Sequence, residues 1–388
     1  MSASRIWAAA ISAVLAVSAL AAVPPTPAAA AQEVPCPRVP PPTPPPATPP
    51  PPPVEQAERK VGGDALATSG LAIPAGAPMA PSVTATAWVV ADVNSGEVLG
   101  GCAPHERRTP ASVQKLLLVA ALMPHLDPEQ IVEVKREDLA DLDPASSLMG
   151  VVEGGRYSIE NLWLGLLLRS GNDAANVLAR VGGGDRGRQG GVDKMNDEAR
   201  RLRANQSHAV TPSGLDGPGQ YTSAYDLAQI ARATFAREDF RRYMQTRVAT
   251  VPAQPGKPAF EIVNDNTLLD RYPGMLGGKT GFTSLARQTY VGVAERDGRR
   301  LAVTLLGAET APLGSLGEAI ALLDWGFALP RDTSAGRLVE PEEKKSSEML
   351  LLSGLVLGAA GALALTVAAH WRRRIGARRE SATSRTFR

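Results

Sequence analysis

The longest apolar stretches of the chain lie near its two ends. The first runs from Ile6 to Val23 and is followed by an alanine run that ends at Ala31. An apolar run followed by small residues is typical of a secretory signal peptide, so we expect residues 1–31 to be removed on export. An uncleaved anchor is the alternative.

The second stretch, 349–370, has about 22 residues without a full charge, enough for a helix to cross a hydrocarbon core of about 30 Å. The arginine-rich segment 371–388 follows directly. Because basic residues favour the cytoplasmic side of a membrane, we expect this tail to lie inside the cell. The predicted location is the cell membrane, with a single transmembrane helix and a catalytic domain on the extracytoplasmic side.

Between these ends, two kinds of hydrophobic pattern predict a mixed fold. Strand-like alternation occurs in two pairs of segments, each joined by a short turn that contains glycine: 85–93 with 97–101, and 289–294 with 301–307. Helical spacing occurs in three segments: 158–180, 193–203 and 316–329. The helical pattern of the first is interrupted at 170–171. We therefore predict an α/β (α+β) domain over 83–330, whose first and last strands form one antiparallel sheet with helices inserted between them.

Proline and glycine indicate where regular structure is not expected. The sequence has 33 prolines, and they dominate 35–53. Such a segment is extended and semi-rigid, so we expect residues 32–82 to form a spacer rich in proline and alanine. We also expect a flexible loop over the glycine-rich 182–191 and a linker over 331–348.

The net charge limits the class of binding partner, and the two cysteines raise the question of a disulfide in an exported protein. The formal net charge is +2, whereas a nucleic-acid-binding protein needs a strongly basic face, so no nucleic-acid partner is expected. The two cysteines, Cys36 and Cys102, would be exported to a compartment where disulfides persist. The cysteines could form one disulfide or remain two separate thiols. The sequence leaves both alternatives open, because it does not show whether their α-carbons approach within bonding range.

The segment 109–118 contains a candidate nucleophile. Ser112 and Lys115 are three residues apart at a helix start, which brings their β-carbons to about 5–6 Å. The apolar run after Lys115 is expected to bury the amine and lower its pKa. A serine beside a partly neutral lysine is an activated nucleophile, and the backbone N–H of Ser112 is a candidate oxyanion donor. An ordinary capped helix after Pro110 is the alternative.

Two further triplets follow in the chain, Ser170-Gly-Asn172 and Lys279-Thr-Gly281. The first alone would also fit the end of a helix, where serine, glycine and asparagine are common. In the order Ser-x-x-Lys, Ser-x-Asn and Lys-Thr-Gly, spread over about 170 residues, the triplets are the motif set of penicillin-binding proteins and active-site serine β-lactamases.

With these motifs the chain resembles the D-alanyl-D-alanine carboxypeptidases among the low-molecular-mass penicillin-binding proteins, in particular their membrane-anchored actinobacterial members. The resemblance spans roughly residues 84–330. It also rests on four longer phrases: Pro110-Ala-Ser-Val-Gln-Lys115, Leu168-Arg-Ser-Gly-Asn-Asp-Ala-Ala175, Thr211-Pro-Ser-Gly-Leu-Asp216 and Gly277-Gly-Lys-Thr-Gly-Phe-Thr283. It implies a fold like that of penicillin-binding proteins and serine β-lactamases, with an antiparallel sheet flanked by helices and an all-helical subdomain. One local departure is the leucine run 116–118, where many relatives carry Met or Thr.

The resemblance also implies roles for the site residues. Ser112 would attack the carbonyl of the penultimate D-alanine and Lys115 would take its proton. Ser170 and Asn172 would share hydrogen bonds with this pair and with the substrate. The remaining implied residues belong to one strand, with substrate binding by Lys279, Thr280, Gly281 and Thr283 and a second oxyanion N–H from Phe282.

No cofactor and no metal are implied by the resemblance. The implied partners are a peptidoglycan stem peptide ending in D-Ala-D-Ala and β-lactam antibiotics as inhibitors. Outside the motifs, we expect a structural or surface role for His208 and a surface role for Arg287.

Two alternatives use the same residues differently. A class A β-lactamase needs a glutamate-activated water, and no Glu-x-x-Leu-Asn lies between Asn172 and Lys279. A non-catalytic penicillin sensor would need a cytoplasmic effector domain, for which the tail after residue 370 is too short. A module that only binds the wall would not need Ser112 and Lys115 together with Asn172 and Lys279.

Overall fold

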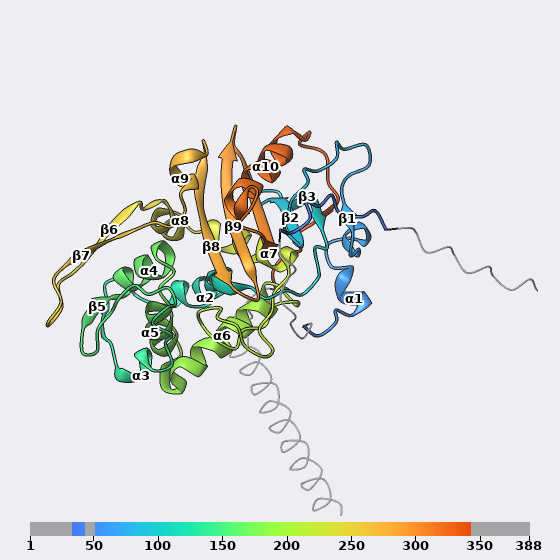
Figure 1. Ribbon diagram of the computed structural model, residues 1–388. Helices are drawn as coiled ribbons and strands as arrows, with labels where there is room; N and C mark the ends of the chain where they lie inside the picture. Colours follow the sequence, from blue (N-terminus) through green and yellow to red (C-terminus); the bar gives the residue numbers. More distant parts are fainter. Residues whose placement is uncertain (1–32, 43–50, 343–388) are drawn as a thin grey trace, which may run out of the picture. The chain divides into compact units, whose positions relative to one another are not determined.

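A seven-stranded antiparallel sheet is the central element of the protein. The computed structural model describes residues 33–42 and 51–342 (Figure 1). The strand order is β1-β3-β2-β10-β9-β8, and β11 also pairs with β3. The strands of this sheet are β1 (Leu71–Ala72), β2 (Ala87–Asp92), β3 (Glu97–Cys102), β8 (Met275–Thr283), β9 (Arg287–Arg296), β10 (Arg299–Ala308) and β11 (Gly336–Arg337).

Both hairpins expected from the sequence are present, and β2 pairs with β10, so the first and last strands share one sheet as predicted. Helices cover both faces of these central strands. The Thr304 hydroxyl donates to the Ala224 carbonyl of α7 (Ala224–Phe235). Leu301 lies instead against Gly326 of α10 (Gly314–Ala328). Side chains three residues apart on a strand point to opposite faces, so α7 and α10 enclose the sheet between them.

The middle of the chain supplies the helical part of the fold, as the resemblance implies. Its main helices are α2 (Lys115–Leu122), α4 (Ile159–Leu168), α5 (Asn172–Gly182), α6 (Gly187–Arg201) and α8 (Glu238–Gln245). Short elements complete the described chain: α1 (Gln56–Arg59), α3 (Arg136–Leu139), α9 (Leu268–Arg271), the hairpin of β4 (Ile131–Glu133) and β5 (Arg156–Ser158), the hairpin of β6 (Val248–Val251) and β7 (Phe260–Val263), and the 3-10 turns η1 (Asp64–Leu66), η2 (Ala111–Gln114), η3 (Met123–His125) and η4 (Gly184–Arg186).

The prediction of a flexible loop over residues 182–191 is wrong. Residue 182 still belongs to α5, a 3-10 turn follows, and α6 begins at Gly187. The glycines serve close packing of the two helices: a β-carbon on Gly191 would lie 2.7 Å from the α-carbon of Ala179. Glycine therefore permits backbone approach here, a use that composition alone does not distinguish from flexibility.

The expected spacer over 32–82 is also different in the structure, since much of it packs onto the sheet. Leu66 and Leu71 are buried, and β1 pairs with β3. A disulfide joins Cys36 to Cys102, with α-carbons 5.7 Å apart, which decides between the two alternatives that the sequence left open. β1 pairs with β3 because β3 would otherwise be an edge strand of the sheet with unpaired backbone groups.

The expected linker over 331–348 is likewise held to the domain as far as the structure describes it. β11 pairs with the remainder of β3, and the Tyr225 hydroxyl donates to the Arg337 carbonyl. The Gln229 side-chain amide donates to the Val339 carbonyl. The folded unit thus extends beyond the predicted 83–330 on both sides.

The predicted signal peptide 1–31 and membrane span 349–370 lie outside the described residues. Within 33–42 and 51–342, no helix is both long and apolar enough for a membrane crossing.

Candidate active site

Ser112 and Lys115 come together where the chain passes from β3 into the helical part. Ser112 lies in the 3-10 turn η2 and Lys115 is the first residue of α2. Lys115 Nζ lies 2.8 Å from Ser112 Oγ, as the three-residue spacing predicts. Ala111, just before the serine, has a φ of 50°, a conformation that costs a non-glycine residue about 1–3 kcal/mol and recurs at active sites.

Lys115 is completely buried, at 0% exposure. Its amine also donates to Asn172 Oδ1 at 2.7 Å and to the backbone carbonyl of Ser213 at 2.7 Å. Burial lowers the pKa of Lys115 well below its usual range, and the nearby charge of Lys279 lowers this pKa further, against a smaller opposing effect of Asp173. The amine is therefore placed and tuned to act as a base toward Ser112.

The second triplet forms the break between α4 and α5. Asn172 begins α5 and contacts Lys115 directly, whereas Ser170 does not hydrogen-bond to Lys115 in the structure. Ser170 has a φ of 58° and is 4% exposed, and within the described residues its hydroxyl has no partner. Since Ser170 also lines the cavity in front of Ser112, its hydroxyl is available to a bound molecule.

The third triplet lies on β8, alongside the nucleophile. Lys279 is 1% exposed, and its amine donates to the Thr280 carbonyl at 2.7 Å. Burial lowers the pKa of Lys279 to about 8, against an opposing effect of Asp265. Lys279 is not among the residues that line the cavity, but its neighbour Thr280 is. Its charge therefore acts from beneath the cavity wall.

Gly281 allows β8 to approach the nucleophile closely. A β-carbon at this position would lie 2.8 Å from the backbone nitrogen of Ser112 and would also meet the Thr289 hydroxyl. Phe282 follows with an exposed side chain, and Thr283 ends the strand. The Thr283 hydroxyl donates to Asp216 Oδ1 at 2.8 Å, so it is already bound to a carboxylate.

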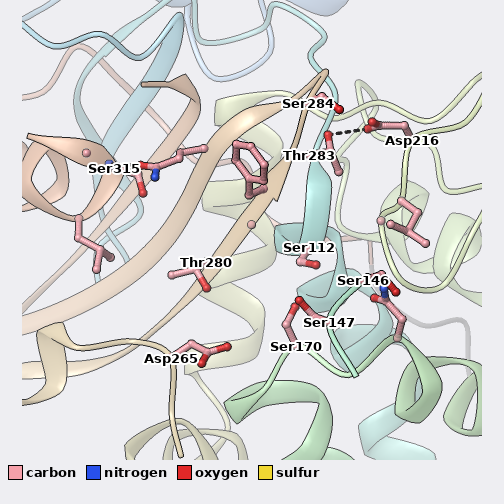
Figure 2. Close-up of a pocket in the computed structure, with 18 of the residues that line it drawn as sticks. Ser112, Ser146, Ser147, Ser170, Asp216, Asp265, Thr280, Thr283, Ser284 and Ser315 are labelled. Atoms are coloured by element: carbon pink, nitrogen blue, oxygen red, sulfur yellow. Dashed lines mark hydrogen bonds between the residues drawn. The ribbon is translucent and has the colours of Figure 1, made fainter. Parts of the chain in front are cut away.

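Residues of all three triplets line one open cavity of about 960 Å³ (Figure 2). Ser112, Ser170 and Thr280 face it from three different elements. Two loops complete its walls, one with Ser146 and Ser147 and the other with Leu215 and Asp216. The described ranges 33–42 and 51–342 contain no group of three side chains suited to hold a metal ion.

Sequence reasoning missed several residues that support this cavity. The Asp173 carboxylate accepts four backbone N–H groups, those of Met149, Gly150, Val151 and Ala174, and so joins the loop before β5 to α5. Ser213 supplies a carbonyl to Lys115. Both belong to phrases noted in the sequence, but only their position in space reveals these contacts.

The two residues expected outside the site lie outside the cavity lining. His208 Nδ1 lies 2.8 Å from the Gly219 carbonyl oxygen. Arg287 forms an ion pair with Glu309 at 2.5 Å.

A comparison of the sequence with known protein families shows to which family this protein belongs. The sequence profile of the D-alanyl-D-alanine carboxypeptidases, peptidase family S11, matches residues 75–310. The chain belongs to this family. The resemblance seen in the motifs is thereby confirmed over most of the folded domain.

Individual members of the D-alanyl-D-alanine carboxypeptidase family are similar over most of the folded domain. The carboxypeptidase DacB2 of Mycobacterium tuberculosis is 42% identical over 269 residues, which cover 68% of this chain and 90% of that protein. DacD of Escherichia coli is 36% identical over 258 residues, 64% of each chain.

Solved structures of similar proteins share the fold. A D-alanyl-D-alanine carboxypeptidase from M. tuberculosis superposes with a TM-score of 0.64 at 40% identity, over 69% of this chain and 99% of that one. The DD-transpeptidase of Streptomyces K15 has a TM-score of 0.61 at 25% identity, over 65% of this chain and 100% of that one. The predicted penicillin-binding-protein fold, with an antiparallel sheet and helices, is confirmed.

Proposed function

We propose that this D-alanyl-D-alanine carboxypeptidase removes the terminal D-alanine from peptidoglycan stem peptides through an ester on Ser112. The observation that carries the proposal is the contact between the buried Lys115 amine and the Ser112 hydroxyl, 2.8 Å apart, at the wall of an open cavity. Membership of the carboxypeptidase family supports the choice of substrate.

The reaction proceeds in two halves. Neutral Lys115 takes the proton of the Ser112 hydroxyl while the serine oxygen forms a bond to the carbonyl carbon of the penultimate D-alanine. The peptide C–N bond then breaks, the proton passes to the departing amine, and free D-alanine leaves. Water next attacks the ester with Lys115 again as base, which releases the shortened peptide and restores Ser112.

The walls of the cavity supply binding and charge stabilisation. The backbone N–H groups of Ser112 and Phe282 hold the negative oxygen of the tetrahedral intermediate. The hydroxyls of Thr280 and Ser170 receive the terminal carboxylate and the departing nitrogen. The positive charge of Lys279 behind Thr280 attracts that carboxylate, and Asn172 orients Lys115. β-Lactam antibiotics inhibit the enzyme because their strained carbonyl acylates the same serine.

Product analysis tests this function. We expect the full-length protein to release D-alanine from a pentapeptide ending in D-Ala-D-Ala and to form a long-lived ester with penicillin at Ser112, detected by mass spectrometry. Ser112→Ala should do neither. Rapid penicillin turnover without release of D-alanine would make the protein a β-lactamase instead. Penicillin labelling that survives Ser112→Ala would remove Ser112 as the nucleophile.

We further propose that the catalytic domain is extracytoplasmic and anchored by a single helix over 349–370. The apolar run and the basic segment after it support this placement. Protease added to intact protoplasts should degrade the catalytic domain and spare a fragment that contains 371–388. Protection of the catalytic domain in the same assay would contradict the proposed orientation.

A further inference from the structure

The two ends of the β8 segment that lines the cavity differ in electrostatic character. At one end, the Thr283 hydroxyl donates its proton to Asp216 Oδ1 at 2.8 Å and accepts the Ala286 N–H at 2.9 Å (Figure 2). Asp216 comes from the loop after Ser213, so this bond joins two separate walls of the cavity. Among the described residues Asp216 forms no ion pair, and its negative charge is not neutralised by a neighbouring cation.

At the other end, the surroundings favour an anion. The Lys279 amine lies behind Thr280 and contacts its carbonyl at 2.7 Å. Ser170 lines the cavity, and its buried hydroxyl has no partner within the described part of the chain. A terminal carboxylate is therefore attracted to the Thr280 end, while at Thr283 it would meet the like charge of Asp216. This argues against the carboxylate-binding role that the sequence suggests for Thr283.

The position of Ser112 then sets the direction of a bound peptide. Gly281 is the β8 residue next to the Ser112 backbone nitrogen, so the scissile carbonyl lies between the two ends. Thr280 and Thr283 are three residues apart, about 10 Å along a strand. An extended peptide with its carboxylate at Thr280 therefore carries the residues before the scissile bond toward Thr283 and Asp216.

We infer that Asp216 is a specificity-determining residue that favours substrates with a side-chain ammonium group on the residue preceding D-Ala-D-Ala. This inference rests on the proposed function. The other charged residues of the cavity wall are Asp143, Asp265 and Arg271. The Asp265 carboxylate forms an ion pair with Arg169, with 2.7 Å between nitrogen and oxygen. Asp143 lies on the exposed loop that also contains Ser146 and Ser147. Asp216 is the carboxylate anchored to the end of β8, where that substrate side chain arrives.

Two substrates that differ in one charge test this inference. The peptides are Nα-acetyl-Lys-D-Ala-D-Ala and the same peptide with its ε-amine acetylated. We expect the full-length protein to have a kcat/KM about threefold to fivefold higher for the free amine, the upper part of the range of a solvent-accessible ion pair. The ratio should fall toward one in 0.5 M salt, because salt screens such a pair.

The variant Asp216→Asn keeps the shape of the side chain and an oxygen that can accept the Thr283 hydroxyl, but it removes the charge. Its ratio of kcat/KM values should be close to one. Asp185→Asn is the matched control, since it removes one negative charge from an exposed residue outside the cavity and should keep the wild-type ratio. Equal rates for both peptides with wild-type protein, or a preference that survives in Asp216→Asn, would overturn the inference alone. Release of D-alanine from neither peptide would overturn the proposed function and this inference with it.

Discussion

The amine of Lys115 lies 2.8 Å from the hydroxyl oxygen of Ser112 and has no exposed surface. The same nitrogen contacts Asn172 Oδ1 and the Ser213 carbonyl, each at 2.7 Å. A charged lysine can donate to all three oxygens, whereas a neutral one donates to two and keeps a lone pair for the proton of Ser112. Burial favours the neutral form, so the environment of the lysine determines whether the serine is reactive.

Replacing Lys115 by methionine should keep the buried volume and remove the base. We expect Lys115→Met to lower the rate of acylation by penicillin by about 10²–10⁴-fold, the usual contribution of a general base. Stopped-flow measurement with a fluorescent penicillin gives this rate. Lys60→Met removes an exposed amine outside the cavity wall and should leave the rate unchanged. A Lys115→Met rate within tenfold of wild type would mean that another base acts.

The pH dependence of kcat/KM should report both lysines. Lys115 must lose its proton to act as a base, so activity rises with pH until that amine is neutral. Lys279, with its pKa lowered to about 8, loses its positive charge above that pH. Capture of the substrate carboxylate then weakens, and kcat/KM should fall as pH rises through about 8.

The variant Lys279→Met separates the two limbs of this profile. The fall near pH 8 should disappear, and kcat/KM should be lower than in wild type below about pH 8 and approach the wild-type value above it, where Lys279 itself is uncharged. The rising limb should move to higher pH, because the charge of Lys279 normally lowers the pKa of Lys115. A falling limb that stays near pH 8 in Lys279→Met would assign it to a different group.

Gly281→Ala tests how closely β8 must approach the nucleophile. The added carbon would lie 2.8 Å from the Ser112 nitrogen and would press on the Thr289 hydroxyl, so the strand or the turn must shift. A displacement of about 1 Å at a catalytic group can cost about 10²-fold in rate. We expect a loss of that size in penicillin acylation with cooperative thermal unfolding retained. Wild-type acylation would show that the oxyanion site tolerates the shift.

Removing the disulfide should affect stability and not chemistry. The bridge between Cys36 and Cys102 closes a loop of 66 residues, for which chain entropy predicts about 4 kcal/mol of stabilisation. We expect the double variant Cys36→Ala and Cys102→Ala to have a free energy of unfolding lower by up to this amount in urea titration. Its acylation rate by penicillin should match that of wild type. A large loss of acylation in the folded variant would show that the bridge supports the site.

Much of the site was predictable because short local sequence motifs specify its catalytic residues. The spacing of Ser112 and Lys115 determines that they share one helical turn, and the apolar residues after Lys115 determine that the amine is buried. The break at 170–171 and the two β-hairpins likewise follow from local periodicity and turn residues. The order of the three triplets was enough to indicate the family.

Contacts between distant segments were decided only by the tertiary structure. The glycines of 182–191 could equally serve flexibility or close packing, and Gly191 serves packing because Ala179 lies against it. Residues 51–82 and 331–342 have the composition of a spacer and a linker, yet they pair with β3, whose backbone groups would otherwise lack partners. The contact between Asp216 and Thr283 spans 67 positions, and no local pattern specifies which residue meets a strand end from so far along the chain.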